Sequence, residues 1–164
     1  MSLSELSEKI SGFQVPLVEF TGGEPLAQEP VKTLMQDLLN KGHKVMVETG
    51  GSESLEGVPR EVHVIMDLKC PDSGMSHKNR YENLDLLKQT DEIKFVIASQ
   101  KDFDWALKTL ETYDLVNRFE ILFSPAWGLV SPKDLVDWIL KSKKRIRLNL
   151  QQHKYIWSPR AKGV

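Results

Sequence analysis

Six short, mostly apolar runs recur along the chain, and several are nearly unbroken stretches of β-branched and apolar residues. Each run stops at a polar or glycine- and proline-containing turn, which is typical of strands in a parallel sheet covered by helices. The pattern predicts strands over residues 15–21, 44–48, 62–68, 93–98, 119–123 and 145–150.

Between these runs, apolar residues recur at the spacing of one helix face. The most regular segment, 30–41, has Pro30 in its first turn and Gly42 just past its end, which is the asymmetry expected of a helix. The spacing predicts helices over residues 4–11, 30–41, 79–88, 102–113 and 131–141.

This alternation predicts an α/β fold with a mostly parallel sheet covered by helices. A length of 164 residues with 40% hydrophobic content fits one domain, 1–164. In such sheets, ligands bind beyond the carboxyl ends of the strands. Polar or glycine-rich stretches that follow strands therefore predict one site, and they lie at residues 21–25, 48–52, 67–71, 124–125 and 151–153.

The stretch Gly22, Gly23, Glu24 and Pro25 links the first predicted strand to the next helix. Two successive glycines let a ligand approach the main chain closely, and Pro25 removes one N–H donor. Carbonyl groups beside a carboxylate suit a cationic group such as an ammonium. The stretch lacks the spacing of phosphate-binding loops, whose N–H groups face the ligand. A tight turn without a ligand is the alternative reading.

The charge and the cysteine content narrow the class of protein. The chain has 22 basic and 23 acidic residues, which argues against a dedicated nucleic-acid or membrane-surface protein. No stretch has the length and apolarity of a membrane span. Its one cysteine, Cys70, excludes an intramolecular disulfide and fits the reducing cytoplasm.

Few other side chains carry a chemical signal. Cys70 reads as a small packing residue, whereas His153, which follows the last strand beside Gln151, is the histidine that we expect to be functional. Trp127 and Trp157 also follow strand ends. They either line a flat heterocycle or pack against the protein, and packing is the expected role.

Several stretches resemble one enzyme family in sequence and in order. They are 20–26, 47–51, 67–71 with Ser73 and Gly74, 92–97 and 147–157. The stretch Gly22 to Pro25 resembles the S-adenosylmethionine (SAM) motif of the radical SAM superfamily. The closing run 152–157 narrows the resemblance to the 7-carboxy-7-deazaguanine synthases of queuosine biosynthesis.

The resemblance implies a partial (βα)6-type radical SAM barrel whose first strand is missing. It also implies a SAM-dependent radical ring contraction of 6-carboxy-tetrahydropterin to 7-carboxy-7-deazaguanine, with a [4Fe-4S] cluster and Mg²⁺. SAM would be bound by Gly22, Gly23, Glu24, Pro25, Glu48, Thr49, Asp67 and Lys69. The pterin would be bound by Gln151 and His153.

One departure from the family pattern limits these expectations. The family holds its cluster on a C-x3-C-x2-C motif, and a single cysteine cannot replace three thiolates. We therefore expect an N-terminally truncated synthase that is inactive alone, with no catalytic or metal-binding residue assigned in this chain. The unpaired edge at 15–21, only partly blocked by Pro16, predicts a homodimer. The alternatives are a non-catalytic SAM- or nucleotide-binding module and a plain interaction domain.

Overall fold

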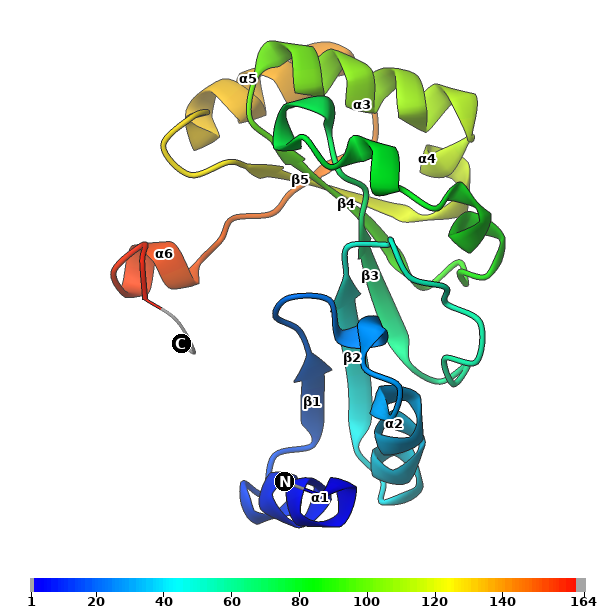
Figure 1. Cartoon of the computed structure of the whole chain (residues 1–164). Coiled ribbons are helices and arrows are strands. Elements are labelled where there is room, and N and C mark those ends of the chain that lie inside the picture. The colour runs from blue at the N-terminus through cyan, green and yellow to red at the C-terminus, as the bar shows by residue number, and fades with distance from the viewer. Residues whose placement is uncertain (1, 162–164) are drawn as a thin grey trace. The chain divides into compact units, whose positions relative to one another are not determined.

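The computed structural model describes residues 2–161 as an α/β fold with a parallel six-stranded sheet and flanking helices (Figure 1). The strands follow chain order in the sheet, so the predicted fold class is confirmed. The chain divides into two compact units. Unit 1 comprises Met1–Asp67 and Lys78–Glu92, and unit 2 comprises Leu68–His77 and Ile93–Val164.

Each predicted strand is present, although its ends differ by a few residues from the expected ones. The last strand is the shortest and keeps two of its six expected residues. The strands are β1 (Leu17–Phe20), β2 (Lys44–Thr49), β3 (His63–Asp67), β4 (Glu92–Ile97), β5 (Glu120–Pro125) and β6 (Arg147–Leu148).

The α-helices include four of the five predicted ones and two single-turn helices that periodicity could not detect. They are α1 (Leu3–Gly12), α2 (Val31–Asn40), α3 (Gln100–Thr112), α4 (Leu115–Arg118), α5 (Pro132–Ser142) and α6 (His153–Ile156). The 3₁₀ turns are η1 (Pro25–Ala27), η2 (Pro71–Ser73), η3 (Ser76–Lys78) and η4 (Tyr81–Asp85). No helix in the described part of the chain is long and apolar enough to cross a membrane.

The helix predicted over 79–88 is wrong, because the segment forms only the 3₁₀ turn η4. Asn83, at its centre, is fully buried and its amide group bonds the backbone of the loop after β2. The Arg80 N–H also donates to the Gly51 carbonyl, at 3.2 Å. These bonds hold the segment on the loop, and the loop contacts replace the continued hydrogen bonding of an α-helix.

Unit 1 is built on β1, β2 and β3, which pair in parallel. The buried residues of α2 supply one side of its core, and alternate buried residues of β2 and β3 supply the other. The fully buried side chains include Met35, Leu38, Val47 and Met66. Burying an aliphatic side chain of this size stabilises the fold by about 1.5–3 kcal/mol.

Unit 2 has an aromatic core between its strands and the helices α3 and α5, which lie on the same side of β4 and β5 (Figure 1). The Phe103 ring of α3 packs edge to face against Phe123 of β5 and Trp138 of α5, with ring centroids 5.5 and 5.6 Å apart. Phe95 of β4 contacts Phe123 at 5.4 Å. Edge-to-face pairs add about 0.5–1.5 kcal/mol beyond the burial of their area.

A polar cluster connects α1 to α2 in unit 1. The buried Ser7 hydroxyl donates to the Asp37 carboxylate at 2.6 Å, and Lys41 Nζ lies 2.6 Å from Ser7 Oγ and 3.0 Å from the carboxylate. The hydrogen bond from Ser7, followed by the contact with Lys41, lowers the pKa of Asp37 below its usual 3.8. The ionised carboxylate therefore stabilises the docking of α1.

We expect α1 to loosen from α2 as the pH falls through the lowered pKa of Asp37. The pKa is lowered in the folded state, so the stabilisation is present above pH 3.8 and is lost in more acidic solution. Asp37→Asn should loosen α1 at neutral pH, seen as faster amide exchange across Leu3–Gly12.

The matched control is Asp137→Asn, which breaks an exposed i,i+4 pair with Lys133 on α5. Among the described residues, none plays the part of Ser7 at this exposed pair. Asp137→Asn should therefore change amide exchange in α5 less than Asp37→Asn changes amide exchange in α1. Equal effects of the two variants would contradict the special role of the Ser7 cluster.

The outer side of β1 is an edge of the sheet, because β1 stands first in the strand order. The apolar residues Phe13, Val15 and Leu17 near this edge are exposed, at 67%, 48% and 47%. The Pro16 carbonyl accepts a bond from Lys44 N at 2.7 Å, so proline sits at the start of the paired region. An apolar, unpaired edge is a site for association with another strand.

We expect the chain to dimerise through this edge, and Leu17→Lys to shift it to monomer because a charged side chain blocks edge pairing. Leu140→Lys on α5, where Leu140 is 70% exposed, is the control and should leave the association unchanged. Sedimentation velocity at several concentrations measures both. A monomer at high concentration in the unsubstituted chain would exclude the dimer.

Candidate functional site

The turn after β1 has the open main chain that its glycines predict. Gly22 and Gly23 are exposed and have φ angles of +83° and +56°, which lie in the left-handed region that favours glycine. No neighbouring atom lies within 4 Å of where a Cβ would be at either residue. Glycine is therefore required here by the backbone conformation, and the main chain remains open to a ligand.

Glu24 joins this turn to the end of β2. Its carboxylate accepts hydrogen bonds from Thr49 Oγ1 at 2.8 and 2.9 Å and from the Gly50 N–H at 2.8 Å. It also accepts one from the Leu26 N–H, at 3.1 Å, and so caps η1. Both carboxylate oxygens are thus engaged by the protein, and Glu24 fixes the relative positions of the two strand ends.

Thr49 acts inside the protein at this site. The residue is 1% exposed, and its hydroxyl donates to Glu24 while accepting a bond from the Gly51 N–H at 3.1 Å. Thr49 therefore orients Glu24. The exposed glycine turn is accordingly the part of this edge that we expect a ligand to approach.

The remaining predicted residues of unit 1 lie at the same edge. Thr49 pairs with Met66 in the parallel register, so Asp67 lies level with Gly50 at the carboxyl ends of β2 and β3. Asp67 is buried and Glu48 is half-buried. Pro25 is buried at the start of η1. Lys69 is half-buried and belongs to unit 2.

Sequence reasoning did not identify Asn83, which fixes the loop after β2. Its Nδ2 donates to the carbonyls of Gly51 at 3.2 Å and Glu53 at 2.8 Å, and its Oδ1 accepts from the Leu55 N–H at 3.1 Å. Gly51 has a φ of +70°, and Met66 Cγ lies 3.0 Å from where its Cβ would be. A side chain at position 51 would collide with Met66.

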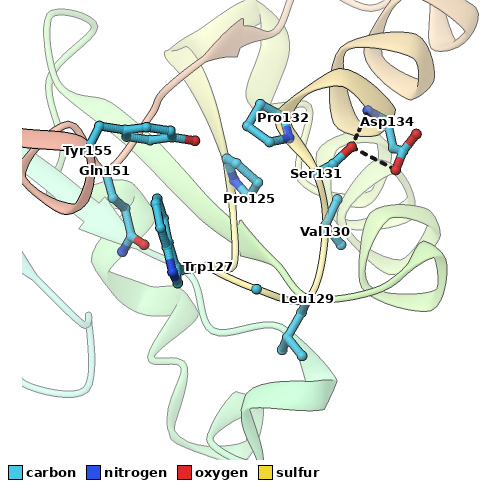
Figure 2. A pocket seen from close by; sticks show the side chains of 10 residues that line it. Pro125, Trp127, Leu129, Val130, Ser131, Pro132, Asp134, Gln151 and Tyr155 are labelled. Atoms are coloured by element: carbon cyan, nitrogen blue, oxygen red, sulfur yellow. Dashed lines mark hydrogen bonds between the residues drawn. The ribbon is translucent and has the colours of Figure 1, made fainter. Parts of the chain in front are cut away.

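Unit 2 contains a pocket of about 540 Å³ beyond the carboxyl ends of β5 and β6 (Figure 2). The parallel pairing of β5 and β6 brings Pro125 and Gln151 to the same edge. The lining is mostly apolar and is formed by Pro125, Trp127, Gly128, Leu129, Val130, Ser131, Pro132, Asp134, Gln151 and Tyr155.

Two aromatic residues form one wall of this pocket. Trp127 and Tyr155 contact edge to face, with ring centroids 4.9 Å apart and planes at 77°. Both are partly exposed, at 41% and 54%. On the other wall, the Ser131 hydroxyl donates to the Asp134 carboxylate at 2.7 Å and accepts from the Asp134 N–H at 3.1 Å, which caps α5.

Gln151 lines this pocket, whereas His153 is exposed at the start of α6 and is not among the lining residues. Tyr155, on the same helix, lines it but was not singled out from the sequence. Trp127 was expected to pack; it contacts the Tyr155 ring and also lines the pocket. Its place two residues after β5 was the signal that the sequence contained.

Comparison with known proteins identifies the family of this chain. A 7-carboxy-7-deazaguanine synthase from Koribacter versatilis is 43% identical over 162 residues, which are 90% of this chain and 72% of that protein. Those of Chlorobaculum tepidum and Clostridium acetobutylicum are each 36% identical, over all of this chain and 76% of their own length. The chain belongs to the 7-carboxy-7-deazaguanine synthase family.

The fold agrees with this family. The crystal structure of QueE from Escherichia coli matches with a TM-score of 0.71 and 19% identity, over 91% of this chain. The chain spans 64% of that protein's length. No protein-family model matches the chain.

The one cysteine of this sequence cannot by itself hold an iron–sulfur cluster. Cys70 is 1% exposed, and a cluster of this kind needs several thiolates. Among residues 2–161, no three side chains of His, Cys, Asp or Glu gather as a metal site would require. We therefore assign no reaction step through a cluster or a metal ion to the described residues.

In this synthase-family chain, we expect Glu24→Gln to loosen both strand ends. An amide has one acceptor oxygen, so it cannot accept from the Leu26 N–H on one side and from the Gly50 N–H on the other, as the two carboxylate oxygens do. Hydrogen bonds to a charged group are worth about 1.5–3 kcal/mol. Exchange of the Gly50 and Leu26 amides should accelerate by at least tenfold, which NMR measures.

Glu29→Gln is the matched control, because Glu29 is an exposed carboxylate between η1 and α2. It should leave both exchange rates unchanged. If Glu24→Gln behaved like Glu29→Gln, Glu24 would not hold the two strand ends together.

Proposed function

We propose that this chain carries the SAM- and pterin-binding parts of a 7-carboxy-7-deazaguanine synthase of the radical SAM superfamily. The reaction of such an enzyme is the ring contraction of 6-carboxy-tetrahydropterin to 7-carboxy-7-deazaguanine. The observation that carries the proposal is the open Gly22–Gly23 main chain, held by Glu24 at the carboxyl edge of unit 1, in a chain of this family. We expect the protein to act in the cytoplasm.

SAM would bind unit 1 through its amino group. A glycine turn with free approach offers carbonyl oxygens to an ammonium, and the nearby Glu24 carboxylate adds negative potential. Glu48 and Asp67, at the ends of β2 and β3, and Lys69 are the further candidates for its ribose and carboxylate. When a cluster is present, SAM supplies the radical in such enzymes. The residues described above bind and orient it.

The pterin would bind residues at the carboxyl ends of the unit 2 strands. Gln151 supports this assignment because it lines a mostly apolar pocket with an aromatic wall. His153 lies two residues further on, at the exposed start of α6. A neutral ring with hydrogen-bonding edges matches this combination of apolar area and few polar groups.

A second candidate is a non-catalytic SAM- or nucleotide-binding module. The single, buried Cys70 favours it, since binding at the strand ends does not depend on thiolates. Both candidates predict SAM binding by this chain. They differ in turnover, which only the synthase can support once a complete set of cluster ligands is supplied.

We expect SAM to bind this chain, and Gly23→Ala to weaken binding by about fivefold or more. Alanine in a left-handed conformation costs roughly 1–2 kcal/mol, which lowers the population of the binding-competent turn. Isothermal titration calorimetry measures both affinities. The chain alone should not convert the pterin.

Gly12→Ala is the matched control, because Gly12 has an ordinary φ and no atom within 4 Å of its Cβ position. It should bind SAM like the unsubstituted chain. The absence of SAM binding, or equal binding by Gly23→Ala and the control, would overturn the assignment of SAM to this turn.

A further inference from the structure

We infer that the unit 2 pocket binds a flat nitrogen heterocycle that is not anionic, with Trp127 stacked on its face, the perpendicular ring of Tyr155 beside it, and Gln151 bonding its edge. The inference rests on the proposed function, because it names the part of a ligand that unit 2 would hold. It adds Trp127 and Tyr155 as the residues that select for an aromatic ring.

The size and shape of the pocket suit a bicyclic ring. Its volume of about 540 Å³ lies within the roughly 300–1,000 Å³ of small-molecule sites. In Figure 2, Trp127 and Tyr155 stand on one side of the pocket, and Pro132 and Val130 stand on the other. A planar ligand fits between two such walls with apolar contact on both of its faces.

The aromatic wall is arranged to receive a ring. The edge-to-face contact between Trp127 and Tyr155 fixes both side chains while each keeps about half of its surface exposed. A rigid aromatic surface loses little side-chain entropy when a ligand stacks on it. Stacking on an aromatic side chain contributes to affinity for every nitrogen base, because each base has a flat π-face.

Gln151 supplies the hydrogen bond that an apolar pocket needs for orientation. Its Oε1 is buried and has no hydrogen-bond partner among residues 2–161. An unpaired buried acceptor is costly, and rotation about the last side-chain torsion of glutamine is easy. A ligand N–H would therefore draw this oxygen into the pocket and satisfy it, with the Nε2 donor free to bond a neighbouring ring acceptor.

The charges of the lining disfavour an anionic ring. Among the described residues, no lysine or arginine lines the pocket, and the one carboxylate in the lining is that of Asp134. A carboxylate substituent on the ligand would have to point out of the pocket. The ligand edge that fits is thus an N–H next to an acceptor, as in a lactam or an aminopyrimidine.

Under the proposed function, two molecules contain a ring of this chemistry: the reaction product, with its deazaguanine ring, and SAM, with its adenine ring. Calorimetric titration with 7-deazaguanine and, separately, with adenosine distinguishes them. We expect at least one probe to bind and Trp127→Leu to weaken it by about tenfold, through the lost stacking. Gln151→Leu should weaken the same probe by about five- to tenfold, through the lost hydrogen bond.

Trp157→Leu is the matched control, because Trp157 is 49% exposed in the same C-terminal segment but does not line the pocket. It should bind the probe normally. Near-UV circular dichroism and thermal melting verify that each variant is folded. A further variant, Tyr155→Phe, keeps the ring and should also bind normally, which separates stacking from the hydroxyl group.

The outcomes separate this inference from the proposed function. Binding of neither probe, or equal binding by Trp127→Leu, Gln151→Leu and Trp157→Leu, overturns the inference even if SAM binds the glycine turn of unit 1. Binding of either probe that depends on both Trp127 and Gln151 supports it, and the preferred probe identifies the ring. Loss of SAM binding in Gly23→Ala without change for 7-deazaguanine assigns the two ligands to separate units.

Discussion

The carboxylate of Glu24 is the constraint on which the candidate SAM site depends. Two donors from the end of β2 and one from the 3₁₀ turn η1 converge on its two oxygens. Without it, the glycine turn after β1 would be tied to its surroundings only through its flanking residues. Because both oxygens already accept hydrogen bonds within the protein, we expect a ligand to approach the exposed main chain of Gly22 and Gly23. Glu24 thus shapes the candidate site chiefly by holding the neutral main chain of the glycine turn in place.

The two units offer different chemistry at the ends of their strands. Unit 1 presents main-chain carbonyls and carboxylates, which suit a cationic or hydroxyl-bearing ligand. Unit 2 presents an apolar pocket with two aromatic rings and a single amide, which suits a neutral heterocycle. A family whose substrates combine an amino acid sulfonium with a pterin would need both kinds of surface. Neither unit offers the thiolates of a cluster among the described residues.

The fold could be predicted because local patterns determine it. Apolar runs marked the strands, and the spacing of apolar residues marked the long helices, including α2 between Pro30 and Gly42. The segment around Asn83 was misread because its helical spacing competes with hydrogen bonds to a loop some 30 residues earlier, which no local pattern reports. The single-turn helices α4 and α6 are too short to show any periodicity.

The sequence predicted where the candidate site residues lie along the strands but not what each side chain does. In unit 1, strand ends indicated where Gly22, Glu24 and Thr49 would lie, and in unit 2 they indicated where Gln151 would lie. The role of each side chain depends on contacts distant in sequence, as the bond from Thr49 to Glu24 illustrates. Tyr155 was missed for the same reason, because its partner Trp127 comes from another loop.

The most direct test of the account is to follow the backbone amide resonances of the chain by NMR while SAM is added. If SAM binds at the glycine turn, the largest shift changes fall on Gly22, Gly23 and Gly50, at the two strand ends that Glu24 joins. The account would be contradicted if SAM bound and those three amides did not respond while others in the chain did.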